Sequence, residues 1–153
     1  MTMEISQQGN KTNEPDVHQG LGHAISFLYR QRRMFMEEAL REYGLQGVMH
    51  MIMAGIYNHP GTSQDKLAEL YALDKGTIAR GAQKLENMEY ITRCLRADNR
   101  RQYHLNLTEK GFEVMQAILR AYDEWGEYIA RDLSDDELVQ VLVLLDRMKE
   151  RYC

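Results

Sequence analysis

Apolar residues recur at helical spacing along most of this chain, and their pattern predicts six helices. From Val17 to about Tyr43 they fall at every third or fourth position, which predicts one long amphipathic helix that stops at Gly44. The segment from about Gly47 to His59 is apolar on almost every side. We therefore expect a second helix there, buried in the middle of the fold and ended by Pro60-Gly61.

The middle of the chain predicts two short helices joined by a tight turn. Thr62 or Ser63 caps the first, and Asp74 is a good N-cap for the second, which runs from Lys75 to about Met88. In this second helix the residues expected to face inward are Ile78, Ala82 and Leu85, and those expected to face solvent are Lys75, Thr77, Arg80 and Lys84.

Two strands, over residues 91–96 and 101–107, are expected next. Asp98 and Asn99 supply the turn between them, and alternation directs Tyr103, Leu105 and Leu107 toward the core. The order helix, turn, helix and basic hairpin, or wing, is typical of DNA-binding proteins.

Two amphipathic helices close the chain, the first capped by Thr108 and the second opened by a capping box over 134–137. Together with the helix from Val17, they leave more apolar surface than a small domain covers. We expect a second copy to cover it, which would set two recognition helices about 34 Å apart for successive major grooves.

The predicted fold is mainly α with a small β-hairpin wing, in three parts. Residues 1–16 are polar, lack periodicity and are expected to be disordered. Residues 17–45 and 112–153 are expected to form a helical dimerisation lobe, and residues 46–111 a winged helix-turn-helix DNA-binding lobe.

Composition and charge fit a soluble protein with a localised basic surface. The net charge is -4, yet most of the charged residues within 75–110 are basic, whereas acidic residues outnumber basic ones from Phe112 onward. No apolar run is long enough for a bilayer and no leader pattern is present, so we expect a cytoplasmic protein with no membrane contact. The five histidines and two cysteines show no ligand spacing, so we expect no metal and no cofactor.

The chain resembles the MarR family of transcriptional regulators over residues 17–150. The most specific match is the wing signature, which stands here as Asp98, Arg100, Leu105, Leu107, Thr108 and Gly111. Supporting matches are Pro60-Gly61, the segments 64–68 and 74–80, Leu85-Glu86 and the segment 90–93. The resemblance implies a homodimer, double-stranded operator DNA as partner, and release by a small, often phenolic or otherwise aromatic effector bound between the lobes.

The chain departs from that family pattern in two places. Glu89 stands where glycine usually precedes the first wing strand, and in a left-handed backbone it would cost roughly 1 kcal/mol. Gln46 and Met49 replace the residues that usually cap the second helix.

The predicted DNA contacts divide into base readers, phosphate ligands and a wing probe. Thr77 and Arg80 are expected at base edges, and Arg100 in the minor groove with Asp98 orienting it. The remaining predicted contacts, to phosphates or groove edges, are Ser63, Gln64, Lys75, Lys84, Arg96 and Arg101. Simple solvation is the alternative for the helix residues, and a closed salt bridge is the alternative for Asp98 and Arg100. Arg93 fits an ion pair as well as a phosphate.

An effector pocket is expected between the lobes. The residues assigned to it are His23, Phe27, Arg30, Met53 and Tyr57, where an aromatic and cationic cleft would suit an aromatic carboxylate; ordinary packing explains them equally well. Cys94 lies in the wing, where a redox role is possible but inert packing is more common.

The sequence thus predicts a ligand-responsive repressor that binds a palindromic operator as a homodimer. One rival is a winged helix that serves as a protein-interaction or assembly module, which would carry a neutral recognition face. The other is an enzyme, but no nucleophile with a base, carboxylate pair or phosphate loop is apparent.

Overall fold

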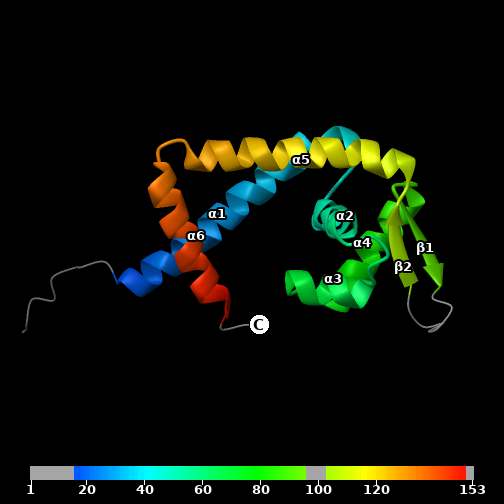
Figure 1. The fold of residues 1–153 in the computed structure, drawn as a ribbon, viewed down its shortest axis with the longest axis horizontal. Helices are drawn as coiled ribbons and strands as arrows, with labels where there is room; N and C mark the ends of the chain where they lie inside the picture. The colour runs from blue at the N-terminus through cyan, green and yellow to red at the C-terminus, as the bar shows by residue number, and fades with distance from the viewer. Residues whose placement is uncertain (1–15, 96–102, 151–153) are drawn as a thin grey trace, which may run out of the picture.

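The structure, a computed structural model, describes residues 16–95 and 103–150. That part of the chain contains six α-helices, a short 3-10 helix and a two-stranded antiparallel hairpin, which confirms the predicted fold class (Figure 1). The elements are α1 Val17–Ala39, η1 Arg41–Tyr43, α2 Met49–Asn58, α3 Gln64–Tyr71, α4 Lys75–Asn87, β1 Ile91–Leu95, β2 Tyr103–Leu107, α5 Glu109–Ala130 and α6 Asp135–Lys149.

The first helix is shorter than its periodicity predicts. Asp16 caps it, accepting from the His18 amide at 3.0 Å, whereas the rest of the segment predicted to be disordered lies outside the described residues. The helix ends at Ala39, and η1 follows as a tighter turn in which the Gly44 amide donates to the Arg41 carbonyl at 3.0 Å. Gly44 has a φ of 68°, so the predicted glycine stop is present five residues beyond the end of α1.

The buried α2 forms the centre of the core, as its continuous apolar pattern predicts. Ile52 and Met53 are fully buried, and α2 packs against α4, α5 and β2. Gly81 allows α4 to approach α2 closely, because a Cβ at this position would lie 2.5 Å from Cδ1 of Ile52. The missing helix cap is also confirmed: Val48 precedes α2 without any side-chain capping bond.

The hairpin is joined to the segment before α3. β1 and β2 pair in the register Ile91↔Leu107 to Leu95↔Tyr103, and the Leu105 amide donates to the Thr62 carbonyl at 2.9 Å. Leu105 is fully buried as predicted, but the inward orientation predicted for Tyr103 is wrong, because its side chain is 38% exposed. At this end of the hairpin the sheet has left the core, and Tyr103 packs instead against Arg93.

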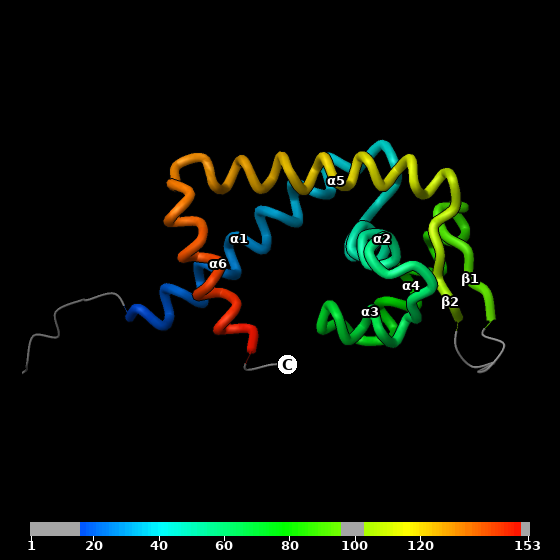
Figure 2. Tube along the Cα trace, viewed as in Figure 1, coloured from blue at the N-terminus to red at the C-terminus, as the bar shows by residue number. Residues whose placement is uncertain are grey.

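The long α5 connects the two ends of the molecule (Figure 2). The hairpin, which packs on α2, α3 and α4, leads into its N-terminus, and α6 leaves its other end. The predicted capping box is present, with the Ser134 amide donating to Glu137 at 2.8 Å. No helix of the described residues is long and apolar enough to cross a membrane.

Candidate nucleic-acid interface

The α3–turn–α4 unit has the geometry of a helix-turn-helix. Ala72 ends α3 in a left-handed conformation with φ 50°, and the Leu73 amide donates to the Ala68 carbonyl at 2.9 Å. Asp74 then caps α4 by accepting from the Thr77 amide at 2.8 Å. The turn is therefore held by backbone and capping bonds, and α4 is fixed relative to α3.

The two faces of α4 differ sharply in burial. Ile78, Ala82 and Leu85 have no exposed surface, as the spacing predicts. On the outer face, the Thr77 hydroxyl donates to Asp74 Oδ2 at 2.6 Å and accepts from Arg80 Nη2 at 3.1 Å. The two predicted base readers thus lie together on an exposed surface of a helix whose other side is anchored in the core.

Three predicted phosphate ligands lie at the start of α3 and α4, and two of them, Ser63 and Lys75, have partners within the chain. The Ser63 hydroxyl accepts from the Lys66 amide at 3.2 Å, so Ser63 rather than Thr62 is the cap, and it is buried. Gln64, the first residue of α3, is partly exposed. Lys75 lies 2.9 Å from Asp65, whose hydrogen bond raises the pKa of Lys75. Their contacts with phosphate stay predictions.

Lys84 lies apart from the base readers. It lines a cavity of about 490 Å³ between α1, α2 and α4, named here the interhelix cavity, together with Tyr29, Arg32, Arg33, Glu37, Gln46, Gly47, Val48, His50 and Met51. Lys84 is about two and a half turns of helix from the N-terminus of α4, so its side chain is placed to meet a ligand of this cavity as readily as a phosphate.

Arg93 connects the wing to the recognition helix. Its Nε donates to Glu86 Oε2 at 2.7 Å and its Nη2 donates to Gln83 Oε1 at 2.5 Å, while its guanidinium lies 5.2 Å from the centre of the Tyr103 ring. The ion pair predicted as one role of Arg93 is therefore present, and a contact with phosphate stays a prediction. Cys94, the next residue, is exposed and pairs with His104 across the hairpin.

Four of the predicted DNA contacts belong to the wing tip. Arg96, Asp98, Arg100 and Arg101 all belong to residues 96–102, which lie outside the described residues. Their assignments as DNA contacts stay predictions from the sequence.

The start of α5 is joined to the end of α4. Lys110 donates to the Met88 carbonyl at 2.9 Å, and the Thr108 hydroxyl donates to the Glu89 carbonyl at 2.6 Å. Gly111 permits this approach, since a Cβ there would lie 2.0 Å from the Tyr90 carbonyl oxygen. Because three consecutive residues of the α4–β1 junction are in contact with α5, the orientation of α5 is coupled to that of the recognition helix.

The part of the chain that the structure describes does not bring the five predicted effector residues together. Met53 is fully buried, and Tyr57 packs edge to face on Phe112 with ring centroids 6.3 Å apart. His23 and Arg30 are exposed on α1. Phe27 lines a separate cavity of about 270 Å³ at the far end of α5.

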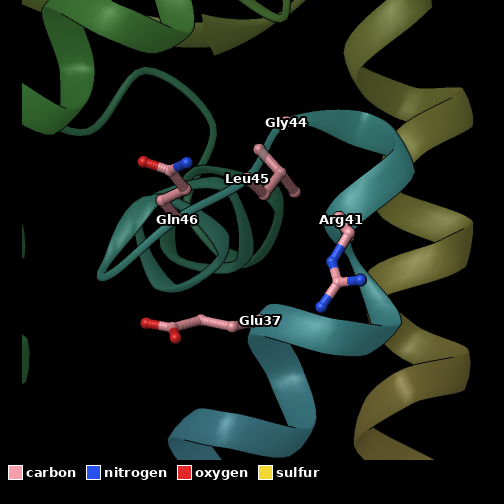
Figure 3. Close-up of a pocket in the computed structure, with 5 residues that line it drawn as sticks. All are labelled: Glu37, Arg41, Gly44, Leu45 and Gln46. Atoms are coloured by element: carbon pink, nitrogen blue, oxygen red, sulfur yellow. The ribbon is translucent and has the colours of Figure 1, made fainter.

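Two neighbouring cavities lie instead beside the loop that joins α1 to α2. One is the interhelix cavity, and the other, of about 390 Å³, is lined by Glu37, Arg41, Gly44, Leu45 and Gln46 (Figure 3). In the second cavity the charged groups have partners, since Glu37 accepts from Arg33 and Arg41 pairs with Glu38. The interhelix cavity is the more cationic of the two, because three basic residues, Arg32, Arg33 and Lys84, line it together with one acidic residue, Glu37.

A buried polar contact lies at the inner wall of the interhelix cavity. His50 Nδ1 lies 2.8 Å from the Tyr122 hydroxyl, and the Arg32 guanidinium lies 5.3 Å from the Tyr122 ring centre. Burial, assisted by the charge of Arg32, lowers the pKa of His50 to about 4, so His50 is neutral at pH 7. Burial also raises the pKa of Tyr122 to about 12. Nothing local in the sequence signals this contact, which joins residues 72 positions apart.

Within residues 16–95 and 103–150, no group of three or more histidine, cysteine, aspartate or glutamate side chains is placed to hold a metal ion.

Comparisons with known proteins agree with this geometry. A family model described as MarR family matches residues 48–103. The uncharacterized HTH-type transcriptional regulator YybA of Bacillus subtilis is 30% identical over 101 residues, covering 66% of this chain and 67% of the relative. The HTH-type transcriptional repressor NicR of Pseudomonas putida is 23% identical, covering 87% of this chain and 84% of the relative. The crystal structure of a MarR transcriptional regulator from Methanosarcina mazei aligns with a TM-score of 0.82 and 30% identity, covering 87% of this chain and 96% of that one.

Proposed function

This chain belongs to the MarR family of transcriptional regulators, which are DNA-binding proteins rather than enzymes, and we propose that it is a repressor that binds a palindromic operator as a homodimer. Occupancy of the operator would exclude the transcription machinery. The similar NicR carries the name of a repressor, which favours this sign of regulation.

The observation that carries the proposal is the exposed face of α4. Thr77 and Arg80 lie there side by side, joined by a hydrogen bond of 3.1 Å, on a helix whose opposite face is fully buried. An arginine so placed suits the O6 and N7 acceptors of guanine in a major groove. Arg93 holds the hairpin against the same helix, so helix and wing would approach the duplex as one rigid unit.

The exposed apolar surface of the terminal helices supports a homodimer. No residue of α6 is buried in the single chain, and α6 does not pack extensively against any other described element. Its exposed apolar residues include Val139, Val141, Leu142, Val143, Leu144, Leu145 and Met148. Full burial of such side chains stabilises by roughly 1.5–3 kcal/mol each, so a second copy would gain strongly by covering them.

The proposed division into lobes is one of function rather than of separate cores. Residues 17–45 and 112–153 would form the dimerisation lobe and residues 46–111 the DNA-binding lobe. The hydrophobic core nevertheless crosses both boundaries, since Met36 and Leu40 lie on one side of it and Met115 and Ile118 on another. A movement in the dimerisation lobe would therefore be transmitted to α2 and α4 by direct packing.

The proposed effector is a small aromatic carboxylate that binds in or next to the interhelix cavity. Arg32, Arg33 and Lys84 supply cationic groups and Tyr29 an aromatic ring in a volume of about 490 Å³. The five residues assigned from the sequence, His23, Phe27, Arg30, Met53 and Tyr57, remain candidates for a pocket completed by the partner subunit. To cause release, the ligand must bind more tightly to a DNA-incompetent arrangement than to the DNA-competent one.

Selection of bound duplexes from a random pool tests the proposal. We expect enrichment of a palindrome with half-sites about one helical turn apart, and loss of this enrichment for Arg80→Ala. Repeating the selection with salicylate or benzoate should reduce recovery of the palindrome. No enriched sequence from a folded, dimeric protein would overturn sequence-specific binding and favour a protein-interaction module.

A further inference from the structure

The side chain of Arg80 is folded back along the N-terminal turn of its own helix. Its Nη2 donates to the Thr77 hydroxyl at 3.1 Å, and that hydroxyl donates in turn to Asp74 Oδ2 at 2.6 Å. Asp74, Thr77 and Arg80 follow one another at intervals of three residues, so they lie along one side of α4. An exposed arginine ordinarily samples many rotamers, whereas here the guanidinium has a defined partner.

Gly76 lies close against this conformation, so a Cβ there would displace the Arg80 guanidinium or the Asp74 carboxylate by a few tenths of an ångström. A Cβ at position 76 would lie 3.1 Å from Nη1 of Arg80 and 3.1 Å from Oδ1 of Asp74. Gly76 has no left-handed backbone that would explain the glycine, and glycine costs a helix roughly 0.5–1 kcal/mol relative to alanine. The clearance for Arg80 is a physical reason for a residue that helix stability alone disfavours.

Asp74 has more contacts than a helix cap requires. Oδ1 accepts the capping bond from the Thr77 amide at 2.8 Å, and this bond alone would satisfy the cap. Oδ2 accepts the separate bond from the Thr77 hydroxyl. These two bonds, with a smaller effect from the charge of Arg80, lower the pKa of Asp74. The carboxylate therefore stays charged at neutral pH and fixes the direction in which the Thr77 hydroxyl points its acceptor lone pairs.

We infer that Asp74, Gly76 and Thr77 are positioning residues that preset the Arg80 guanidinium, and that they thereby determine a preference for guanine at the base pair that Arg80 reads. The inference rests on the proposed DNA-reading role of Arg80. One N–H of the guanidinium is held by Thr77, and the rest of the fork stays free for the O6 and N7 acceptors of guanine. Restricting the fork before binding reduces the entropy lost when it meets the base.

The test is a double-mutant cycle on base preference. Three variants, Thr77→Val, Thr77→Ser and Gly76→Ala, are made in the natural chain and again with Arg80→Ala. Each is titrated by fluorescence anisotropy against the selected duplex, the same duplex with the guanine replaced, and a random duplex. Valine has the shape of threonine without the hydroxyl, and serine keeps the hydroxyl, so the serine variant is the matched control.

Arg80→Ala should lower the preference for guanine by roughly 5- to 150-fold, the range expected for one bidentate arginine. Thr77→Val and Gly76→Ala should each lower the preference for guanine by at least about threefold. With Arg80→Ala present, neither should lower it further, because the group that they position is gone. Thr77→Ser should keep the preference.

The outcomes separate the inference from the proposal beneath it. An unchanged preference in Arg80→Ala would show that Arg80 reads no base, and both would fail. A lost preference in Arg80→Ala, with equal effects of Thr77→Val in the two backgrounds, would leave Arg80 as a reader and overturn the positioning role. Gly76→Ala favours the helix, so a loss of preference in that variant, with unchanged circular dichroism, does not reflect unfolding.

Discussion

Glu89 strains the backbone at the junction between α4 and β1, and glycine at this position should stabilise the protein. Its φ is 64°, in the left-handed region, which costs an L-residue roughly 1–2 kcal/mol. Glycine avoids that cost but loses roughly 0.5–1 kcal/mol more backbone entropy on folding. The Glu89 side chain is 82% exposed, with its carboxylate 3.8 Å from Lys110, so this ion pair contributes little. The balance is a gain of roughly 0.5–1 kcal/mol for Glu89→Gly.

The matched control is Glu89→Ala, which removes the carboxylate but keeps the Cβ that causes the strain. Urea denaturation at one fixed protein concentration should give Glu89→Gly a higher free energy of unfolding than Glu89→Ala. Ala72→Gly, at a φ of 50°, should change stability in the same direction. Equal free energies for the glycine and alanine variants at position 89 would refute the assignment of strain to this residue.

Three further predictions concern the wing, the core histidine and the last helix. Arg93→Ala should weaken operator binding severalfold in mobility-shift assays while dimerisation persists, because the wing loses its attachment to α4. Full affinity in Arg93→Lys would instead indicate that residue 93 contacts a phosphate. The pKa of His50 is lowered from 6.5 to about 4, so the unfolded chain binds a proton that the folded chain does not. Stability should therefore fall as pH drops from about 6.5 to 4, by roughly 3 kcal/mol in total, and His50→Gln should flatten that part of the profile in denaturation experiments. Removal of residues 135–153 should abolish dimerisation and tight operator binding together in ultracentrifugation and anisotropy; a soluble monomer with full affinity would contradict the dimer interface.

The sequence predicts those features of the fold that depend only on neighbouring residues. The cap at Asp74 and the inward positions of α4 follow from residue type and spacing, and both are confirmed. The orientation of Tyr103 could not be predicted, because alternation states which residues share a face but not where the sheet leaves the core. The residue at which α1 ends could not be predicted from the apolar spacing either, because a 3-10 turn keeps a similar spacing for several residues.

The candidate site was predictable in its location more than in its contacts. Residue types and order indicate that α4 reads DNA, but the position of Lys84 beside α1 depends on how α1 crosses the other helices. The same crossing separates Phe27 from Met53, which a helical pattern alone places on facing helices. The pairing of Arg93 with Glu86 was one of two open interpretations, and it depends on the packing of β1 on α4, which the sequence does not specify.

The length of α5 explains how a small effector could release DNA from the proposed dimer. Its 22 residues, at 1.5 Å each, make a rod about 33 Å long. Its first turn is held to the end of α4 by Lys110 and Thr108, so a tilt of α5 moves the recognition helix with it. A tilt of about 10° about its C-terminal end shifts its N-terminus by about 6 Å, nearly two base-pair steps of about 3.4 Å. Because base readout requires side chains to be placed to a fraction of a step, a tilt of this size would take both recognition helices of the proposed dimer out of register with the operator.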